Sequence, residues 1–141
     1  MEQKMRRAGP GDCLLLLLSI LDLAGIRTVF APCGPKEDGS WMTCHWAGQA
    51  VTGAAAVLLV LALVHILVLD RGMKVGLDAG IAAVALLTAL LPGRLIGLCM
   101  MPDMRCHQLM VPGITVCAVL MILSAILDAG FRLRKEKHHD I

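Results

Sequence analysis

The segment AGQAVTGAAAVLLVLALVHILVL, residues 47–69, contains no Asp, Glu, Lys or Arg. As a helix rising 1.5 Å per residue it extends about 35 Å, enough to cross a hydrocarbon core of roughly 30 Å. Three further stretches have a similar apolar character, at 13–31, 76–98 and 108–130, and Pro92-Gly93 near the far end of the second of these is expected to kink its helix or stop it early. The sequence therefore predicts an all-α membrane protein with four transmembrane helices.

The composition agrees with a membrane protein of one domain. The chain has 141 residues, of which 57% are hydrophobic, and a mean hydropathy of +0.76. A water-soluble domain is rarely so apolar, so the expected partner is the lipid bilayer. The formal net charge is only +2, which gives no indication of a nucleic-acid partner. We expect one membrane domain over residues 1–141.

The distribution of basic residues predicts the orientation. Nine of the thirteen Lys and Arg residues lie in the amino-terminal segment, the turn after residue 69 and the carboxy-terminal tail. Positive charge is retained on the cytoplasmic side of a membrane. Both termini are therefore expected in the cytoplasm, and the two cysteine-containing loops outside it. The nine residues are Lys4, Arg6, Arg7, Arg71, Lys74, Arg132, Arg134, Lys135 and Lys137.

The two halves of the chain carry the same features in the same order, which indicates an internal repeat. Each half has a cysteine, then a Met-x-Cys-His step, then a Leu-Asp pair near a glycine. We expect a four-helix bundle of two parallel helical hairpins, about 12–70 and 76–130, related by a pseudo-twofold axis along the membrane normal, followed by a tail at 131–141. The matched residues are Cys33, Met42-Thr43-Cys44-His45 and Leu69-Asp70-Arg71-Gly72 in the first half, and Cys99, Met104-Arg105-Cys106-His107 and Leu127-Asp128-Ala129-Gly130 in the second.

The four loop cysteines are the first candidate functional residues. In an oxidising space they are expected to form disulfides, and the simplest pairing closes each loop, Cys33 with Cys44 and Cys99 with Cys106. Loops of that length gain roughly 2.5–3 kcal/mol from such a bond in a chain-entropy estimate. Pairing between the two loops would join the hairpins instead. Four cysteines allow three connectivities, and the sequence leaves the choice open.

Two other kinds of chemistry are compatible with the same residues. The pairs Cys44-His45 and Cys106-His107 could together offer two thiolates and two imidazoles to zinc, and nearby methionines would favour copper(I). Redox chemistry is the other alternative, because membrane thiol oxidases that pass electrons to quinone also have four spans and two extracytoplasmic cysteine pairs. Those enzymes carry a C-x-x-C pair, which this sequence lacks.

A few polar residues lie inside the predicted spans. Asp22 is near the middle of the first span, where a carboxylate is costly, so it is expected to face the interior of the helix bundle. A contact with Thr52 or Thr88 is the simpler interpretation, and a role in proton relay or ion coupling is the alternative. Arg27 and Arg94 lie close to the loops and are expected to extend their side chains toward the membrane surface, with anion binding as the alternative. His65 is expected to be a packed or interfacial residue.

The pattern Trp41-Met42-Thr43-Cys44-His45-Trp46, with Cys99 and Met104-Arg105-Cys106-His107, resembles a family of small uncharacterised bacterial and archaeal membrane proteins, domain of unknown function 4418. The resemblance covers residues 13–130. It implies four helices in a prokaryotic plasma membrane, and it supplies no activity and no catalytic residue.

The sequence favours a non-enzymatic accessory subunit of a larger membrane assembly, such as one for transport, with two disulfide-closed loops. No cofactor is predicted, zinc or copper being an alternative. A membrane-protein partner or a second copy of the chain is expected.

Overall fold

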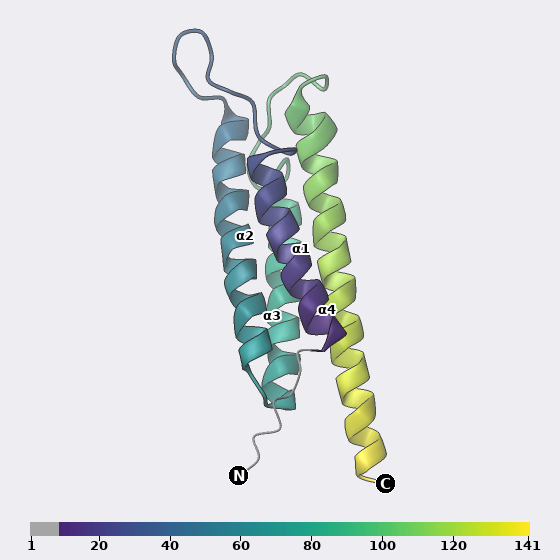
Figure 1. Cartoon of the computed structure of the whole chain (residues 1–141). Coiled ribbons are helices and arrows are strands. Elements are labelled where there is room, and N and C mark those ends of the chain that lie inside the picture. Colours follow the sequence, from purple (N-terminus) through teal and green to yellow (C-terminus); the bar gives the residue numbers. More distant parts are fainter. Residues whose placement is uncertain (1–8) are drawn as a thin grey trace.

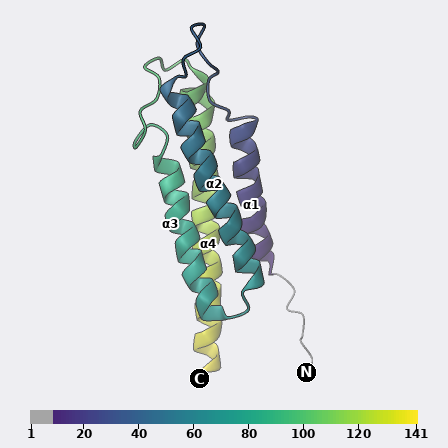
Figure 2. The same cartoon turned by 90° about the vertical axis from the view of Figure 1, so that its left-hand side faces the viewer.

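The computed structural model describes residues 9–141 and contains only helices and loops in that range. The helices are α1 (Pro10–Arg27), α2 (Thr43–Leu67), α3 (Arg71–Leu90) and α4 (Val111–His139). A single π-helical turn, η1 (Cys106–Met110), leads directly into α4. Figures 1 and 2 show the four long helices lying side by side.

The helices surround a common interior, in which each one packs against two others. Helix α1 contacts α2 and α4, and α3 contacts the same two helices. The loops at 28–42 and 91–105 lie together at one end, which we call the cysteine end (Figure 1). The start of α1, the short connection between α2 and α3, and the end of α4 lie at the other, which we call the terminal end (Figure 1).

The interior is filled by small and branched apolar side chains. One cluster occupies the middle of the helices, and a second lies toward the cysteine end. Alanines at these positions let the helix backbones approach closely, as is typical of helices packed in a membrane. The first cluster comprises Leu15, Leu18, Leu58, Ile81, Ala85, Ala118, Met121 and Ala125, and the second Ile26, Ala47, Val51, Met110 and Ile114.

An aromatic side chain joins two helices just below the cysteine end. The Phe30 ring lies against Gly25 of α1 and Gly113 of α4, and a methyl group added at either glycine would overlap it. In the same region Pro32 packs on Gly48 of α2, where a side chain would also overlap. These contacts fix the path of the loop that carries Cys33.

The third helix differs most from its predicted bounds. It begins at Arg71, because the Asp70 side chain accepts a hydrogen bond from the Met73 backbone N–H at 2.9 Å and caps the helix. It ends at Leu90, before Pro92, and Gly93 follows with a φ of 85°. Pro92 and Gly93 therefore stop the helix, and the chain reaches the cysteine end as a loop.

The fourth helix extends beyond the predicted span. It continues through the expected tail to His139, so the basic residues after 130 lie on a helix. The first two helices begin three to four residues earlier than predicted, at Pro10 and Thr43.

Three helical segments are long and apolar enough to cross a membrane: α2, α3 and the continuous helix from Cys106 to His139. Helix α1 has 18 residues, and Asp12, Asp22 and Arg27 make it less apolar. The described chain is thus an all-helical structure with three candidate membrane spans and one more polar helix.

Candidate functional site

The four loop cysteines converge at the cysteine end. The Sγ atoms of Cys33 and Cys106 are 3.2 Å apart, and those of Cys44 and Cys99 are 3.3 Å apart. The Met42 thioether is 3.7 Å from the Cys99 sulfur. We call these five residues the sulfur cluster.

The cluster is more than two separate pairs. The Sγ atoms of Cys33, Cys44 and Cys106 all lie within 4.8 Å of one another, and Cys99 contacts Cys44. Cys44 lies in the first turn of α2 and Cys106 begins η1, and both are fully buried. Cys33 and Cys99 come from the two loops and are partly exposed. The two helix starts thus hold the inner sulfurs, and the loops cover them.

The expected disulfides are not formed in the structure, where all six cysteines are free. The closest sulfur pairs join the two loops, whereas the predicted disulfides close each loop on itself. The pairing within each loop stays a prediction. Burial raises the pKa of the Cys99 thiol, but hydrogen bonds from Cys44, Thr43 and the local backbone together lower that pKa below its ordinary value.

The two histidines do not join the sulfurs, which differs from the two-thiolate, two-imidazole metal set considered above. The His107 Nε2 atom lies 2.7 Å from the Cys99 carbonyl oxygen. The His45 ring stacks on Trp41 with centroids 4.0 Å apart. Consecutive residues of a helix point in different directions, so a cysteine directed inward leaves the next side chain outside. The possible donor set consists of sulfur atoms alone.

The predicted intramembrane polar residues lie at separate places. Asp22 is 1% exposed and faces the interior as expected. Thr88 is buried and donates to the Val84 carbonyl at 2.8 Å within its own helix. Its expected contact with Asp22 is not formed: within residues 9–141, Asp22 Oδ1 has no hydrogen-bond partner. Arg27 and Arg94 are exposed near the cysteine end.

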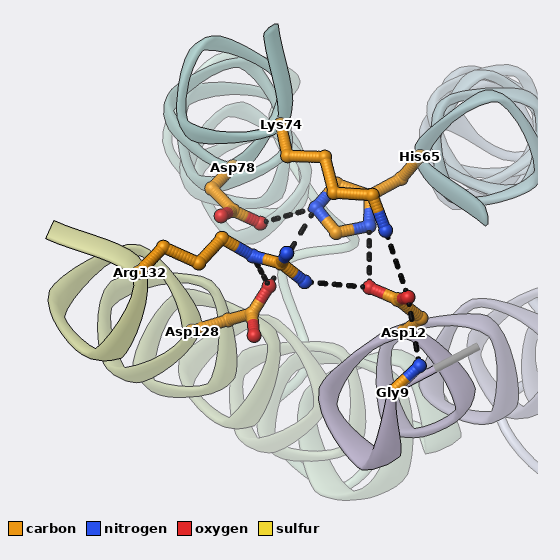
Figure 3. A network of polar contacts seen from close by, with 7 residues as sticks. All are labelled: Gly9, Asp12, His65, Lys74, Asp78, Asp128 and Arg132. Carbon is orange, nitrogen blue, oxygen red and sulfur yellow. Dashed lines mark hydrogen bonds and ion pairs between the residues drawn. The ribbon is translucent and has the colours of Figure 1, made fainter. Parts of the chain in front are cut away.

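A second polar group, buried between the helices, occupies the terminal end (Figure 3). Asp12 of α1 accepts hydrogen bonds from the Lys74 ammonium at 2.8 Å and the Arg132 guanidinium at 3.0 Å. Arg132 also donates to Asp128, one turn earlier on α4, at 2.8 Å. We call Asp12, His65, Lys74, Asp78, Asp128 and Arg132 the ionic cluster. All four helices contribute to it.

His65 lies at the centre of the ionic cluster and is fully buried. Its Nδ1 atom is 3.0 Å from an Asp12 oxygen, and its Nε2 atom is 2.9 Å from an Asp78 oxygen. Neither contact has the alignment of a hydrogen bond, so we describe them as close electrostatic contacts. His65 is buried, as expected for a packed histidine. Its contacts with Asp12 and Asp78 were not predicted.

The ionic cluster was not predicted, although the sequence contains a signal for it. Asp12, Asp78 and Asp128 each lie near the same end of a predicted helix, and an acidic residue at the edge of an apolar span usually has a buried partner. The basic residues Lys74 and Arg132 contribute only to the predicted orientation of the chain in the membrane. Recognising the cluster requires knowing which helix faces come together.

The fold and the two clusters define the class of the chain: an all-helical protein with long apolar helices suited to a membrane, and a cluster of interacting polar or sulfur side chains at each end of its interior. It belongs to the family described as domain of unknown function (DUF4418), whose sequence profile matches residues 15–131. No curated protein and no solved structure matches the chain.

Proposed function

We propose that the chain is a four-helix transmembrane bundle with both termini in the cytoplasm. Helix α1 is the least apolar span, but its two acidic residues, Asp12 and Asp22, are buried against the other helices, and its one basic residue, Arg27, lies at its end next to the loop. The face that it turns outward is apolar, with Leu17 54% and Leu21 52% exposed. Its 18 residues extend about 27 Å, close to the thickness of a hydrocarbon core.

The charges at the two ends support this orientation. Six Lys and Arg residues among positions 9–141 lie at the terminal end or on the last turns of α4, and four lie on or near the loops of the cysteine end. The positive-inside rule therefore favours a cytoplasmic terminal end and an extracytoplasmic cysteine end. The resemblance to the family supports a prokaryotic plasma membrane as the compartment.

The sulfur cluster supports the proposed internal repeat. The repeat matches Cys33 with Cys99 and Cys44 with Cys106. A pseudo-twofold axis along the membrane normal would then exchange the Cys33–Cys106 contact with the Cys99–Cys44 contact. The two distances, 3.2 and 3.3 Å, are almost equal. Two equivalent contacts of this kind are what related hairpins would produce.

We further propose that the sulfur cluster binds one soft metal ion, copper(I) or zinc. The observation that carries this proposal is the convergence of more than two sulfurs on one place. Zn–S bonds of about 2.3 Å put neighbouring thiolates of a tetrahedral site about 3.8 Å apart. The spread of Cys33, Cys44 and Cys106, within 4.8 Å, is close to that spacing. Met42 adds a thioether, and an all-sulfur set favours copper(I).

The metal proposal is tested by metal content. Protein purified in mild detergent is analysed for copper and zinc per chain, in parallel with the double variant Cys44→Ser, Cys106→Ser. We expect about one metal ion per chain in the unaltered protein and none in the variant. The matched control is Cys13→Ser with Cys117→Ser, which changes the two cysteines outside the cluster and should retain the metal. Metal-free protein from cells grown with added copper and zinc would reject the proposal.

One feature favours thiol–disulfide exchange as a second candidate function. Each partly exposed cysteine contacts a fully buried one, Cys33 with Cys106 and Cys99 with Cys44. In the oxidised form each pair would be a disulfide: a substrate thiolate would attack the exposed sulfur and release the buried cysteine as a thiolate, and the second substrate thiol would then displace the exposed cysteine, leaving the substrate as a disulfide. A quinone that accepts two electrons and two protons would re-form the protein disulfide. Turnover of a dithiol with a quinone as electron acceptor tests this candidate. Activity that survives replacement of all four cysteines would exclude it.

A membrane partner is also a proposal. The exposed rings of Trp41 and Trp46 lie beside the sulfur cluster, where a partner that receives or delivers the metal could dock. Co-purification from native membranes tests this role of accessory subunit, and a chain that is recovered only as a monomer would argue against it.

A further inference from the structure

A cavity of about 560 Å³ opens at the terminal end, outside the sulfur cluster and next to the ionic cluster. Its size is within the range of ligand-binding pockets. The start of α1, the connection between α2 and α3, and the cytoplasmic part of α4 form its walls. The polar and charged lining residues are Asp12, Arg71, Lys74, Ser124, Asp128, Arg132 and Lys135.

The cavity carries an excess of positive charge. Four basic residues line it against two carboxylates, Asp12 and Asp128, which leaves two positive charges. Both carboxylates are already occupied, since they pair with Lys74 and Arg132. Within residues 9–141, Arg71 and Lys135 form no ion pair, and both are exposed. The free charge of the cavity therefore suits an anion.

The remaining wall of the cavity is apolar and faces outward. Leu14 of α1 is 45% exposed, and Leu127 and Phe131 of α4 are 60% and 64% exposed. Leu69 adds a fourth large apolar side chain. A small free anion would leave this surface uncovered. A molecule with an anionic head and an acyl chain would match both parts of the lining.

We propose that this cavity binds one anionic phospholipid. Basic pockets between transmembrane helices on the cytoplasmic side bind the head groups of such lipids. The negative surface potential of that leaflet attracts the basic side chains of the pocket. Arg71 and Lys135 contact the phosphate, while Leu14, Leu127 and Phe131 contact the acyl chain. The ionic cluster acts as the floor of the site, because Asp12 and Asp128 hold Lys74 and Arg132 in place. The inference uses the proposed orientation to identify the leaflet, and it is independent of the metal proposal.

The test measures lipid binding by native mass spectrometry of the full chain in detergent, with phosphatidylglycerol and phosphatidylcholine as probes. We expect phosphatidylglycerol to bind with a stoichiometry of one and to be preferred over phosphatidylcholine. The double variant Arg71→Gln, Lys135→Gln should bind phosphatidylglycerol about 30-fold more weakly, from roughly 1 kcal/mol per basic residue. Both side chains are exposed, so the fold should be unaffected.

The matched control is Arg134→Gln with Lys137→Gln, which removes two charges from the same part of α4 but outside the cavity lining. It should bind phosphatidylglycerol like the unaltered protein. Equal losses in both double variants would show a general effect of surface charge and overturn the proposal. Displacement of the lipid by millimolar inorganic phosphate would identify a free anion as the ligand and would also overturn the proposal. These measurements need neither a membrane orientation nor a bound metal.

Discussion

Asp12 holds the terminal end of the helices together, and replacing it should cost a large part of the stability. Its carboxylate is 2% exposed and accepts charged hydrogen bonds from Lys74 and Arg132. Asp12→Asn keeps the shape and can still accept from the Gly9 backbone N–H, now 3.0 Å away. It removes the negative charge that offsets two cations. Each hydrogen bond to a charged group contributes about 1.5–3 kcal/mol.

Breaking a buried ion pair on one side usually costs about 3–5 kcal/mol. We expect the lower value, about 3 kcal/mol, because Arg132 keeps Asp128 and the Lys74 stem can turn its ammonium into the cavity. For a chain of this size the midpoint of thermal unfolding should fall by roughly 10 °C. The assay is thermal unfolding in detergent, followed by circular dichroism. Asp103→Asn, an exposed acid in the loop at 91–105, is the control. If both variants unfold at the same temperature, the ionic cluster does not stabilise the fold as argued.

Three further predictions concern packing and the metal. Gly113→Ala should lose about 1–3 kcal/mol of unfolding free energy, because the new methyl group overlaps Phe30, whereas Gly53→Ala meets open space and should be neutral or slightly stabilising. Leu58→Ala, in the interior, should lose about 2–5 kcal/mol, while Leu63→Ala, exposed on the same helix, should lose little; equal losses would contradict the assigned interior. Removing the metal with a chelator should lower the unfolding temperature of the unaltered protein. The chelator should not change the unfolding temperature of the double variant Cys44→Ser, Cys106→Ser.

The sequence predicted the helices well because long apolar runs are a local signal. It predicted their ends less well. The third helix starts at Arg71, within the expected turn, because Asp70 caps it there. Its end at Leu90 is the early stop that Pro92 and Gly93 indicated. The tail after 130 is helical because α4 simply continues beyond its apolar part. The start of the third helix and the end of the fourth depend on capping and on helix continuation, and a hydropathy pattern contains no information about either.

The candidate site was partly predictable. The internal repeat predicted that the cysteines of the two loops lie near one another, and in the structure their sulfur atoms are in contact. The role of the histidines could not be read from the sequence, because it depends on where His45 and His107 point relative to their neighbouring cysteines. His45 instead stacks on Trp41 and His107 contacts the loop backbone.

The ionic cluster shows the limit of reading single spans. Asp12 and Arg132 are 120 positions apart, yet they form a hydrogen bond. No local pattern connects two such residues, and each alone has a simpler explanation, as a helix-start acid or a cytoplasmic flanking base. Only the arrangement of the helices around one interior brings them together.

The central claim is that the sulfur cluster binds a metal ion, and thiol alkylation followed by intact mass tests it most directly. The protein should carry Cys13→Ser and Cys117→Ser, so that only the four cluster thiols can react. We predict that the folded protein resists alkylation, that a chelator without any reductant exposes all four thiols, and that the native mass includes one metal ion. If the thiols react only after a reductant is added, and the chelator has no effect, the cysteines are disulfide-bonded and the metal proposal is wrong.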